Sequence, residues 1–402
     1  MKAVVFHDIG DIRLDEVSDP RIKEPNDAVV KITKSAICGT DLHMVRGTMP
    51  GMEPGTILGH EGVGVVESIG KNVRNIKIGD RVIVSSTIAC GYCSYCRAGY
   101  YSQCDNSNPL GWKSGSAFFG GPKSAGSFNG MQAEYVRVPF ANIGLTKIPE
   151  SVTDDQAVLL SDVFPTGYFA ADIAGIHPGD TVAVFGAGPV GDFAIISSFL
   201  MGASRVMSID HIDSRLLKAQ ELGAEIINFE EEDPVHTVFR LTGGIGVDKV
   251  IDAVGIDAEM PERGPARAAA RKKQEKYEEE ISQTNPKPQR NEGWLPGNAP
   301  SLALEWEVES LAKAGTLSIV GVYPENADFF PIGMAMNKNI RINMGNCPHR
   351  RYIPRLLNLI ESKMVKPEQV LTQKEPFDSI ISAYRSFNAR QEGWIKVELN
   401  SL

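Results

Sequence analysis

The stretch Thr181-Val-Ala-Val-Phe-Gly-Ala-Gly-Pro-Val-Gly191 decides the fold of this chain. Its apolar first half predicts a buried strand, and the apolar run 190–201 predicts a helix. The turn between them has the pattern G-x-G-x-x-G, in the strand–turn–helix context that marks a dinucleotide site. The pyrophosphate of a dinucleotide would lie at the positive N-terminus of that helix. We expect the cofactor to contact Gly186, Gly188, Pro189, Val190 and Gly191.

The glycines of this turn have different roles. The first permits the tight turn, the second lets the backbone approach the pyrophosphate, and the third lets the helix pack on the strand. Asp210 ends the next predicted strand. A carboxylate there accepts hydrogen bonds from the adenosine ribose and repels a 2′-phosphate, so the sequence favours NAD over NADP. The alternative is an ordinary aspartate at a strand end, and the nearby cations His211 and Arg215 weaken the argument against NADP.

Strands and helices alternate beyond this turn. The pattern predicts a helix over 214–222 and strands over 181–185, 205–209, 249–253, 316–320 and 340–344. This alternation indicates a doubly wound parallel sheet, and we assign residues 163–344 to a Rossmann domain. Further cofactor contacts are expected at Thr166, Arg215, Val254, Gly255, Val320 and Gly321.

Residues 257–300 do not fit the alternation. The segment is charged, with three basic residues at 271–273 answered by three glutamates at 278–280. We interpret it as an insertion, a short helix followed by an irregular loop at the surface. Its apolar residues Trp294 and Leu295 suggest that it docks over the cofactor or a subunit contact and slows NAD exchange. The alternative is a solvated excursion without a role.

The flanking parts of the chain have another pattern. Residues 1–162 are β-rich, with short apolar runs at 28–32, 62–69 and 81–84 separated by turn residues. Residues 345–402 return to mixed helix and strand and are expected to rejoin that first domain. A length of 402 residues suits about two domains. The chain is therefore assigned to the α/β class, with a β-rich domain beside the Rossmann domain.

Composition excludes several classes of partner. The hydrophobic share of 42% and the charged share of 23% are typical of a globular protein. A net charge of −9 argues against a nucleic-acid partner. The sequence has no apolar run of about 18 residues, which argues against a membrane span. The N-terminus lacks the pattern of a signal peptide, and four of the six cysteines have metal-type spacing, so we expect the protein in the cytoplasm.

The four crowded cysteines predict a structural zinc site. Their spacing is C-x2-C-x2-C-x7-C, within a loop over residues 88–105. Four thiolates surround zinc tetrahedrally and leave no position for a substrate. Such a site stabilises a loop that has little core of its own. An iron–sulfur cluster and unrelated thiols are the alternatives. The expected ligands are Cys90, Cys93, Cys96 and Cys104.

A second group of residues suggests chemistry. The stretches Cys38-Gly-Thr-Asp-Leu-His43 and Gly59-His-Glu61 supply a thiolate and an imidazole, which are good zinc donors. Alone, such residues are usually a buried thiol and an ordinary histidine. With the glycine turn and the cysteine loop, however, the sequence resembles the zinc-containing medium-chain alcohol dehydrogenases along almost its whole length, the insertion excepted. The stretch 161–168, Ser-Asp-Val-Phe-Pro-Thr-Gly-Tyr, is most similar to the glutathione-independent formaldehyde dehydrogenases.

The resemblance implies a GroES-like catalytic domain and a set of roles. Cys38, His60 and Asp162 would bind a catalytic zinc, so that each chain holds two Zn2+ ions with the cysteine loop. Glu61 would be a nearby carboxylate able to approach the metal, and Thr166 would lie beside the nicotinamide. Thr40 can hydrogen-bond the substrate oxygen and pass its proton toward His43. The alternatives are a helix N-cap for Asp162 and a plain exposed histidine for His43.

The sequence gives less information about the residues of the substrate pocket. Ser86 would leave space near zinc, and candidate wall residues, which could equally be core, are Trp112, Phe118 and Phe119. We expect NAD-dependent oxidation of formaldehyde or of a small alcohol or aldehyde by a homo-oligomer, a tetramer rather than a dimer. The alternatives are a sibling alcohol dehydrogenase or carbonyl reductase with a larger substrate, and a non-catalytic NAD-binding protein. A zinc-free quinone reductase is disfavoured, because it needs neither zinc site.

Overall fold

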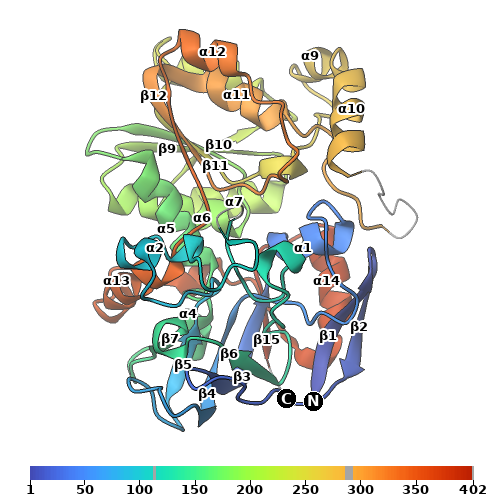
Figure 1. The fold of residues 1–402 in the computed structure, drawn as a ribbon. Coiled ribbons are helices and arrows are strands. Elements are labelled where there is room, and N and C mark those ends of the chain that lie inside the picture. The colour runs from blue at the N-terminus through green and yellow to red at the C-terminus, as the bar shows by residue number, and fades with distance from the viewer. Residues whose placement is uncertain (112–114, 286–292, 401–402) are drawn as a thin grey trace. The chain divides into compact units, whose positions relative to one another are not determined.

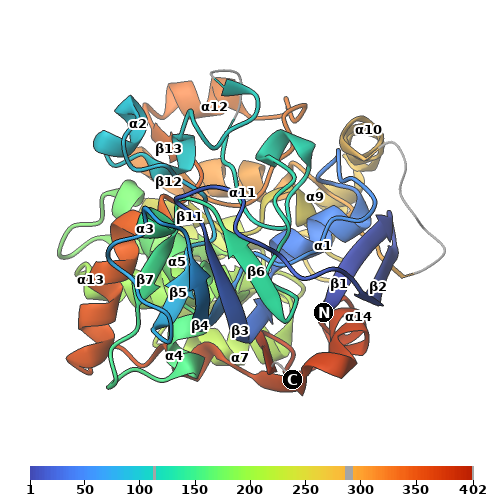
Figure 2. The same ribbon diagram turned by 60° about the horizontal axis from the view of Figure 1, so that its bottom comes forward.

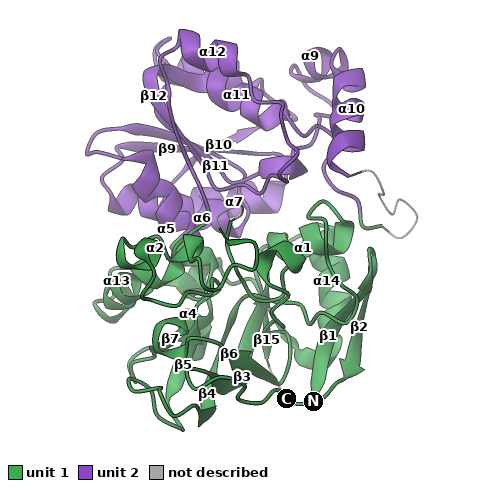
Figure 3. Cartoon of the chain, viewed as in Figure 1, with its two compact units in different colours: residues 1–165, 289–294, 346–402 green, residues 166–288, 295–345 purple. Residues whose placement is uncertain are grey.

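The chain folds into two compact units. The structure, a computed structural model, describes residues 1–111, 115–285 and 293–400. Unit 1 comprises residues 1–165, 289–294 and 346–402, and unit 2 comprises residues 166–288 and 295–345 (Figure 3). The boundaries predicted from the sequence, after residues 162 and 344, lie three residues and one residue before those of the structure. The sequence pattern also assigned the whole insertion to the nucleotide domain, whereas Trp294 groups with unit 1.

Unit 2 is built on a six-stranded parallel sheet, with the strand order β10-β9-β8-β11-β12-β13 (Figure 1). The strands are β8 (Thr181–Phe185), β9 (Arg205–Asp210), β10 (Glu225–Asn228), β11 (Val247–Asp252), β12 (Leu311–Ile319) and β13 (Arg341–Met344). The helices are α5 (Val163–Ala174), α6 (Pro189–Leu200), α7 (Asp213–Glu221), α8 (Pro234–Leu241), α11 (Leu302–Ser310) and α12 (Ile332–Asn337). The order reverses at β8, so the doubly wound parallel sheet predicted from the sequence is confirmed.

Both faces of this sheet are covered. Ala183 and Phe185 of β8 lie in a core cluster with side chains of α8 and α11. Val182 and Val184 point to the opposite face, where they pack with side chains of α5, α6 and α7. This two-sided burial explains the uninterrupted apolar run that ends at the glycine turn.

Unit 1 has a seven-stranded sheet and a hairpin (Figure 2). The hairpin joins β1 (Lys2–Asp8) and β2 (Asp11–Glu16). The sheet order is β14-β15-β3-β4-β5-β7, and β6 also pairs with β3. Its strands are β3 (Ala28–Ile37), β4 (Gly62–Ile69), β5 (Arg81–Val84), β6 (Tyr135–Val138), β7 (Leu145–Lys147), β14 (Gln373–Pro376) and β15 (Val397–Asn400). Strand β15 lies between β14 and β3, so the C-terminal segment completes the sheet.

The helices of unit 1 are short apart from one near the end of the chain. They are α1 (Gly39–Arg46), α2 (Ser94–Arg97), α3 (Ala141–Gly144), α4 (Asp154–Val158), α13 (His349–Glu361) and α14 (Ile380–Asn388). Helix α14 packs through Tyr384 and Phe387 on a core cluster that also contains Leu42 and Met44 of α1. Helix α1 therefore rests on a packed apolar layer.

The insertion is more ordered than the sequence predicted. It forms two helices, α9 (Arg267–Arg271) and α10 (Gln274–Thr284), and Tyr277 is buried in a small core with Ala270 and Leu302. Trp294 is 2% exposed and belongs to the core cluster of unit 1, whereas Leu295 is 54% exposed. Trp294 is therefore an apolar anchor within unit 1, whereas docking of Leu295 on the cofactor or on a second subunit stays a prediction.

None of the helices in the described parts of the chain has the length and apolar character needed to cross a membrane.

Glu307 of α11 is a buried carboxylate that gives one test of this fold. Neither of its oxygens has a hydrogen-bond partner among the described residues, and burial raises the pKa of this group well above its ordinary value. The folded chain therefore holds a proton that the unfolded chain releases, and stability falls as the pH rises above about 4.5. Glu307→Gln should gain stability relative to the parent by up to about 1.4 kcal/mol per pH unit, measured by urea unfolding at pH 5 to 8. A difference in unfolding free energy that does not change with pH would contradict this prediction. The control is Glu279→Gln, because Glu279 is exposed.

Candidate metal and cofactor sites

The four cysteines of the loop lie together in unit 1. The sulfur atoms of Cys90, Cys93, Cys96 and Cys104 are within 4.8 Å of one another. Backbone N–H groups point at them: Cys90 N donates to Cys104 Sγ at 3.2 Å, and Cys96 N donates to Cys93 Sγ at 3.5 Å. Burial raises the pKa of Cys104, but hydrogen bonds from Ser107 and the Cys90 backbone outweigh it and lower this pKa to about 7. Such N–H···S contacts stabilise thiolates, the form that binds zinc.

A second cluster of zinc-type donors is buried elsewhere in unit 1. One ligand atom from each of Cys38, His60, Glu61 and Asp162 lies within 4.8 Å of the others. Asp162 Oδ2 is 3.8 Å from Cys38 Sγ and 3.6 Å from His60 Nε2. The structure thus brings together the three residues that the resemblance implied as ligands, although 124 positions separate the first from the last.

The ring of His60 is held from behind. Its Nδ1 lies 3.1 Å from Asp41 Oδ1, an ion-pair contact that lacks hydrogen-bond geometry, and its Nε2 faces Asp162. Asp41 Oδ2 in turn accepts hydrogen bonds from Cys38 N and from Gln132 Nε2. A carboxylate behind a histidine fixes its tautomer and orientation, as in many metal sites. No role was predicted for Asp41, although this residue lies in the first turn of α1, three residues after Cys38.

Glu61 has a fully buried cationic partner. Its Oε2 accepts a hydrogen bond from Lys396 Nζ, and both side chains are 0% exposed. Burial raises the pKa of Glu61 to about 7, and Lys396 opposes that shift. The other oxygen, Oε1, is buried without a hydrogen-bond partner among the described residues. That orphaned oxygen beside three further donors is what a cation site requires.

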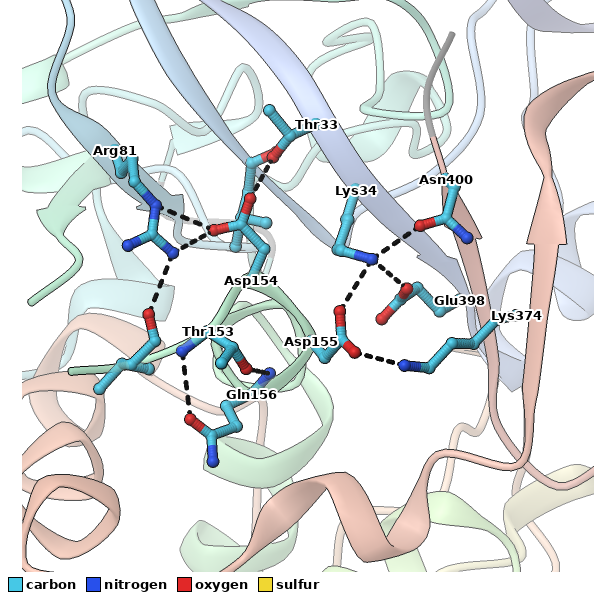
Figure 4. Close-up of polar contacts among 12 residues, drawn as sticks. Thr33, Lys34, Arg81, Thr153, Asp154, Asp155, Gln156, Lys374, Glu398 and Asn400 are labelled. Atoms are coloured by element: carbon cyan, nitrogen blue, oxygen red, sulfur yellow. Dashed lines mark hydrogen bonds and ion pairs between the residues drawn. The ribbon is translucent and has the colours of Figure 1, made fainter. Parts of the chain in front are cut away.

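Asp162 follows α4, which is fixed at its beginning by charged neighbours (Figure 4). Asp154 accepts a hydrogen bond from Thr33 at 2.9 Å and one from Arg81 Nε at 3.1 Å. Asp155 lies 2.8 Å from Lys34 Nζ, which also binds Glu398 of β15. These contacts tie α4 to the sheet, and the chain reaches Asp162 four residues after the helix ends.

A second histidine holds Asp162. His349 Nε2 lies 2.7 Å from Asp162 Oδ1 and His349 Nδ1 lies 3.2 Å from Thr87 Oγ1. Burial raises the pKa of Asp162, but the hydrogen bonds from His349 and His60 outweigh it and hold this pKa well below its ordinary range. Asp162 is therefore an anion, the form in which a carboxylate binds zinc. Asp162 also directly precedes α5, so it occupies the N-cap position that was its alternative role.

The other predicted residues of the catalytic domain lie as follows. Thr40 is half-buried in the first turn of α1. His43 is 5% exposed, so the reading as a plain exposed histidine is wrong, and its Nδ1 is 2.9 Å from Thr48 Oγ1. Phe118 packs edge-on to His60 with ring centroids 6.1 Å apart and also against a core cluster, so it stays a candidate wall residue. Phe119 belongs to the core. Ser86 is buried. Trp112 lies outside the described residues.

The glycine turn of unit 2 has the geometry of a dinucleotide site. Gly186 has a φ of +92°, where a side chain is strained, and a Cβ at Gly191 would lie 1.8 Å from Gly186 O. At Gly188, the N-cap of α6, the nearest atom to a Cβ would be Arg215 Nη1 at 3.8 Å. Pro189 occupies the first helical position, which suits its missing N–H group. The turn is therefore closed on two sides and open at its second glycine.

Asp210 organises the neighbouring strand end. Its Oδ2 accepts a hydrogen bond from Ala187 N at 2.8 Å, and its Oδ1 accepts one from His211 N at 2.7 Å. Burial raises the pKa of Asp210, but the nearby Arg215 and His211 lower it below its ordinary value. His211 also lies 3.1 Å from Glu259. His211, one of the two side chains that weakened the argument for NAD, thus lies between the carboxylates of Asp210 and Glu259.

The turns that follow β11 and β12 approach each other closely. A Cβ at Gly255 would lie 2.4 Å from Val322 N, and a Cβ at Gly321 would lie 2.4 Å from Gly255 N. Both glycines are therefore needed for packing, and Val254 and Val320 flank the same contact. Thr166 lies in the first turn of α5.

Comparison with known proteins identifies the family. The model of the alcohol dehydrogenase GroES-like domain matches residues 24–150, and that of zinc-binding dehydrogenases matches residues 189–262. An uncharacterised zinc-type alcohol dehydrogenase-like protein of Bacillus subtilis is 36% identical over 346 residues, or 85% of each chain. The chain belongs to the zinc-type alcohol dehydrogenase family. Zinc and NAD are the cofactors expected for that family, and the GroES-like and Rossmann-type domains are confirmed.

Two further similarities bear on the zinc-type alcohol dehydrogenase family. An alcohol dehydrogenase from Thermus sp. ATN1 matches the whole chain over its own whole length, with a TM-score of 0.81 and 32% identity. A glutathione-independent formaldehyde dehydrogenase of Pseudomonas aeruginosa is 40% identical over 207 residues, which are 50% of this chain and 51% of that protein. The resemblance to formaldehyde dehydrogenases thus holds for half of the chain, while that to zinc-type alcohol dehydrogenases is broader.

Proposed function

We propose that the protein is a zinc-dependent, NAD-linked oxidoreductase that oxidises formaldehyde or a small alcohol or aldehyde by hydride transfer to NAD. The observation that carries this proposal is the buried cluster of Cys38, His60 and Asp162, with its donor atoms within 4.8 Å. A sulfur, a nitrogen and an oxygen ligand leave a fourth tetrahedral position for substrate. The cysteine loop would hold a second, structural zinc.

Each side chain around the cluster has a different role in the proposed reaction. Zinc, when bound, would supply a Lewis acid that polarises the substrate oxygen. Thr40 Oγ1 would hydrogen-bond the substrate hydroxyl, and the proton would pass toward the ring of His43, whose Nδ1 is held by Thr48. Phe118 would exclude water on one side of His60. Glu61, held by Lys396, would approach the metal during ligand exchange.

A small substrate is supported by the stretch around Asp162 and by the partial match to a formaldehyde dehydrogenase. The test is a panel of formaldehyde, primary alcohols and larger secondary alcohols, followed at the NADH absorbance, with zinc analysis of the same preparation. We expect the highest kcat/KM for formaldehyde or a short primary alcohol and two zinc ions per chain. Preference for a bulky secondary alcohol would favour the sibling dehydrogenase. The absence of turnover with every substrate would favour the NAD-binding protein without catalysis.

We propose that NAD is preferred because two carboxylates, Asp210 and Glu259, oppose a 2′-phosphate. Asp210→Gly should shift the ratio of the NADPH and NADH dissociation constants toward NADPH by about 30- to 150-fold, which corresponds to about 2–3 kcal/mol. Glu259→Gln should shift it in the same direction by a smaller factor, since it leaves the hydrogen bond to Ala187 intact. Titration of cofactor fluorescence measures both constants, and exposed Glu221→Gln is the control. Equal affinity of the parent protein for both cofactors would contradict the assignment.

We propose a homo-oligomer, with a tetramer favoured over a dimer. Strand β13 is an edge strand of the unit 2 sheet, and its four residues are exposed, Met344 by 62%. Ile332 and Met336 of α12 are also exposed. An uncovered apolar edge is a ready surface for pairing with a second copy. Four of the cysteines are grouped as in a metal site, which supports a reducing compartment such as the cytoplasm.

A further inference from the structure

His349 is a buried side chain to which no step of the proposed function has yet been assigned. It is the first residue of α13 and is 3% exposed. Its two ring nitrogens contact different elements of unit 1: Nε2 contacts Asp162 Oδ1 at 2.7 Å, and Nδ1 contacts Thr87 Oγ1 at 3.2 Å. The ring therefore links Asp162 to the residues that follow β5.

These contacts determine the proton positions on the ring. A hydroxyl can donate to Nδ1, whereas a carboxylate only accepts. The carboxylate only accepts, so the Nε2–H group of His349 donates to Asp162 Oδ1, while Nδ1 contacts the Thr87 hydroxyl. One oxygen of Asp162 is thereby engaged. The other, Oδ2, is the oxygen that faces Cys38 and His60.

We propose that His349 is a positioning residue that turns Asp162 Oδ2 toward the catalytic zinc and makes this carboxylate a one-oxygen ligand. The inference rests on the proposed function, because it takes Asp162 as the third ligand. Asp41 lies 3.1 Å from His60 Nδ1, so two of the three ligands would have a buried, oppositely charged neighbour at the atom opposite the metal. Neither partner was evident from the spacing of the ligands in the sequence.

The test uses the full-length zinc-loaded protein and measures metal release. His349→Leu keeps much of the side-chain volume but removes the donor, and zinc should leave one site to a chelator at least about 10-fold faster than in the parent. His349→Gln, which keeps an N–H donor, should restore much of the slow release. The zinc of the cysteine loop should be retained in each variant and serves as an internal control of folding.

A spectroscopic measurement separates positioning from general destabilisation. With Co2+ in place of the releasable zinc, the visible d–d bands report the ligand geometry. His349→Leu should change their energy or intensity while the melting temperature stays close to that of the parent. If His349→Leu fails to fold, Thr87→Val takes its place, because it removes the hydroxyl that contacts Nδ1 and leaves the imidazole present.

Asp162→Ala distinguishes failure of the inference from failure of the proposed function. If this variant keeps both zinc ions with the parent's release rate, the proposed ligand set is wrong. If Asp162→Ala loses one zinc but His349→Leu has the release rate and cobalt spectrum of the parent, His349 has no positioning role. Fast release and altered bands in His349→Leu, restored by His349→Gln, would support it.

Discussion

Replacing Cys38 by alanine should lower kcat/KM for alcohol oxidation by on the order of 10³-fold or more and remove one of two zinc ions. Loss of Lewis-acid stabilisation of the transition state is worth several kcal/mol, and each 1.36 kcal/mol is a factor of ten. Cys38 is 6% exposed and supplies the sulfur donor of the described cluster, whose other donors are an imidazole and two carboxylates. Elemental analysis and the NADH assay measure the two effects.

Cys347→Ala is the matched control, because Cys347 is a buried cysteine outside both metal clusters. It should keep two zinc ions and most of the activity. The four-cysteine site should survive in the Cys38 variant, and circular dichroism should show an intact fold. A parent protein with one zinc per chain, or a Cys38→Ala variant with full activity, would overturn the assignment of this cluster.

Replacing Trp294 by alanine should destabilise the protein by about 3–5 kcal/mol, the range for truncating a buried aromatic side chain. Trp294 is 2% exposed, although it comes from the charged insertion. It packs in the cluster that contains Tyr384 and Phe387, and Asn388 donates a hydrogen bond to the carbonyl of Gly293 at 2.7 Å. Asn388 also accepts from Arg46, at the end of the helix that carries Thr40 and His43. The indole thus supports the apolar layer beneath α1.

Leu295→Ala is the control, since the neighbouring leucine is half exposed and should cost no more than about 0.5 kcal/mol. Chemical denaturation with a constant m-value measures both variants. Equal stability of the two would show that Trp294 is not part of the core. Comparison of NAD release in the same variants tests the expectation that the insertion slows cofactor exchange: faster release from Trp294→Ala alone would support it.

Much of the fold could be predicted from the sequence, because its signals are local. The strand before Gly186 and the helix after it are parts of one short motif, and the structure differs there by one residue at each helix end. The insertion was harder, since its burial depends on Trp294 meeting residues more than eighty positions away. Adjacent apolar residues look alike in a sequence, so the different burial of Trp294 and Leu295, 2% and 54% exposed, could not be predicted.

The metal ligands were inferred from resemblance, but their supporting residues were not. Asp41 could have been found, since an aspartate three residues after Cys38 sits in the first turn of the same helix. Lys396 and His349 give no such signal. Each is an ordinary charged or titratable residue in an amphipathic context. Lys396 reaches the site because β15 pairs with β3, and His349 reaches it because it begins α13.

The discontinuity of unit 1 has a consequence for biosynthesis. Cys38, His60, Glu61 and Asp162 precede the main part of unit 2 in the chain. Lys396, the partner of Glu61, and His349, the partner of Asp162, follow it. Strand β15, which pairs with the long β3, also arrives at that late stage. Domains generally fold as units during synthesis, so the nucleotide-binding unit can be complete while the catalytic centre still awaits its final strand. Under the proposed function, the buried partners of the metal ligands are therefore in place only after unit 2 has been translated.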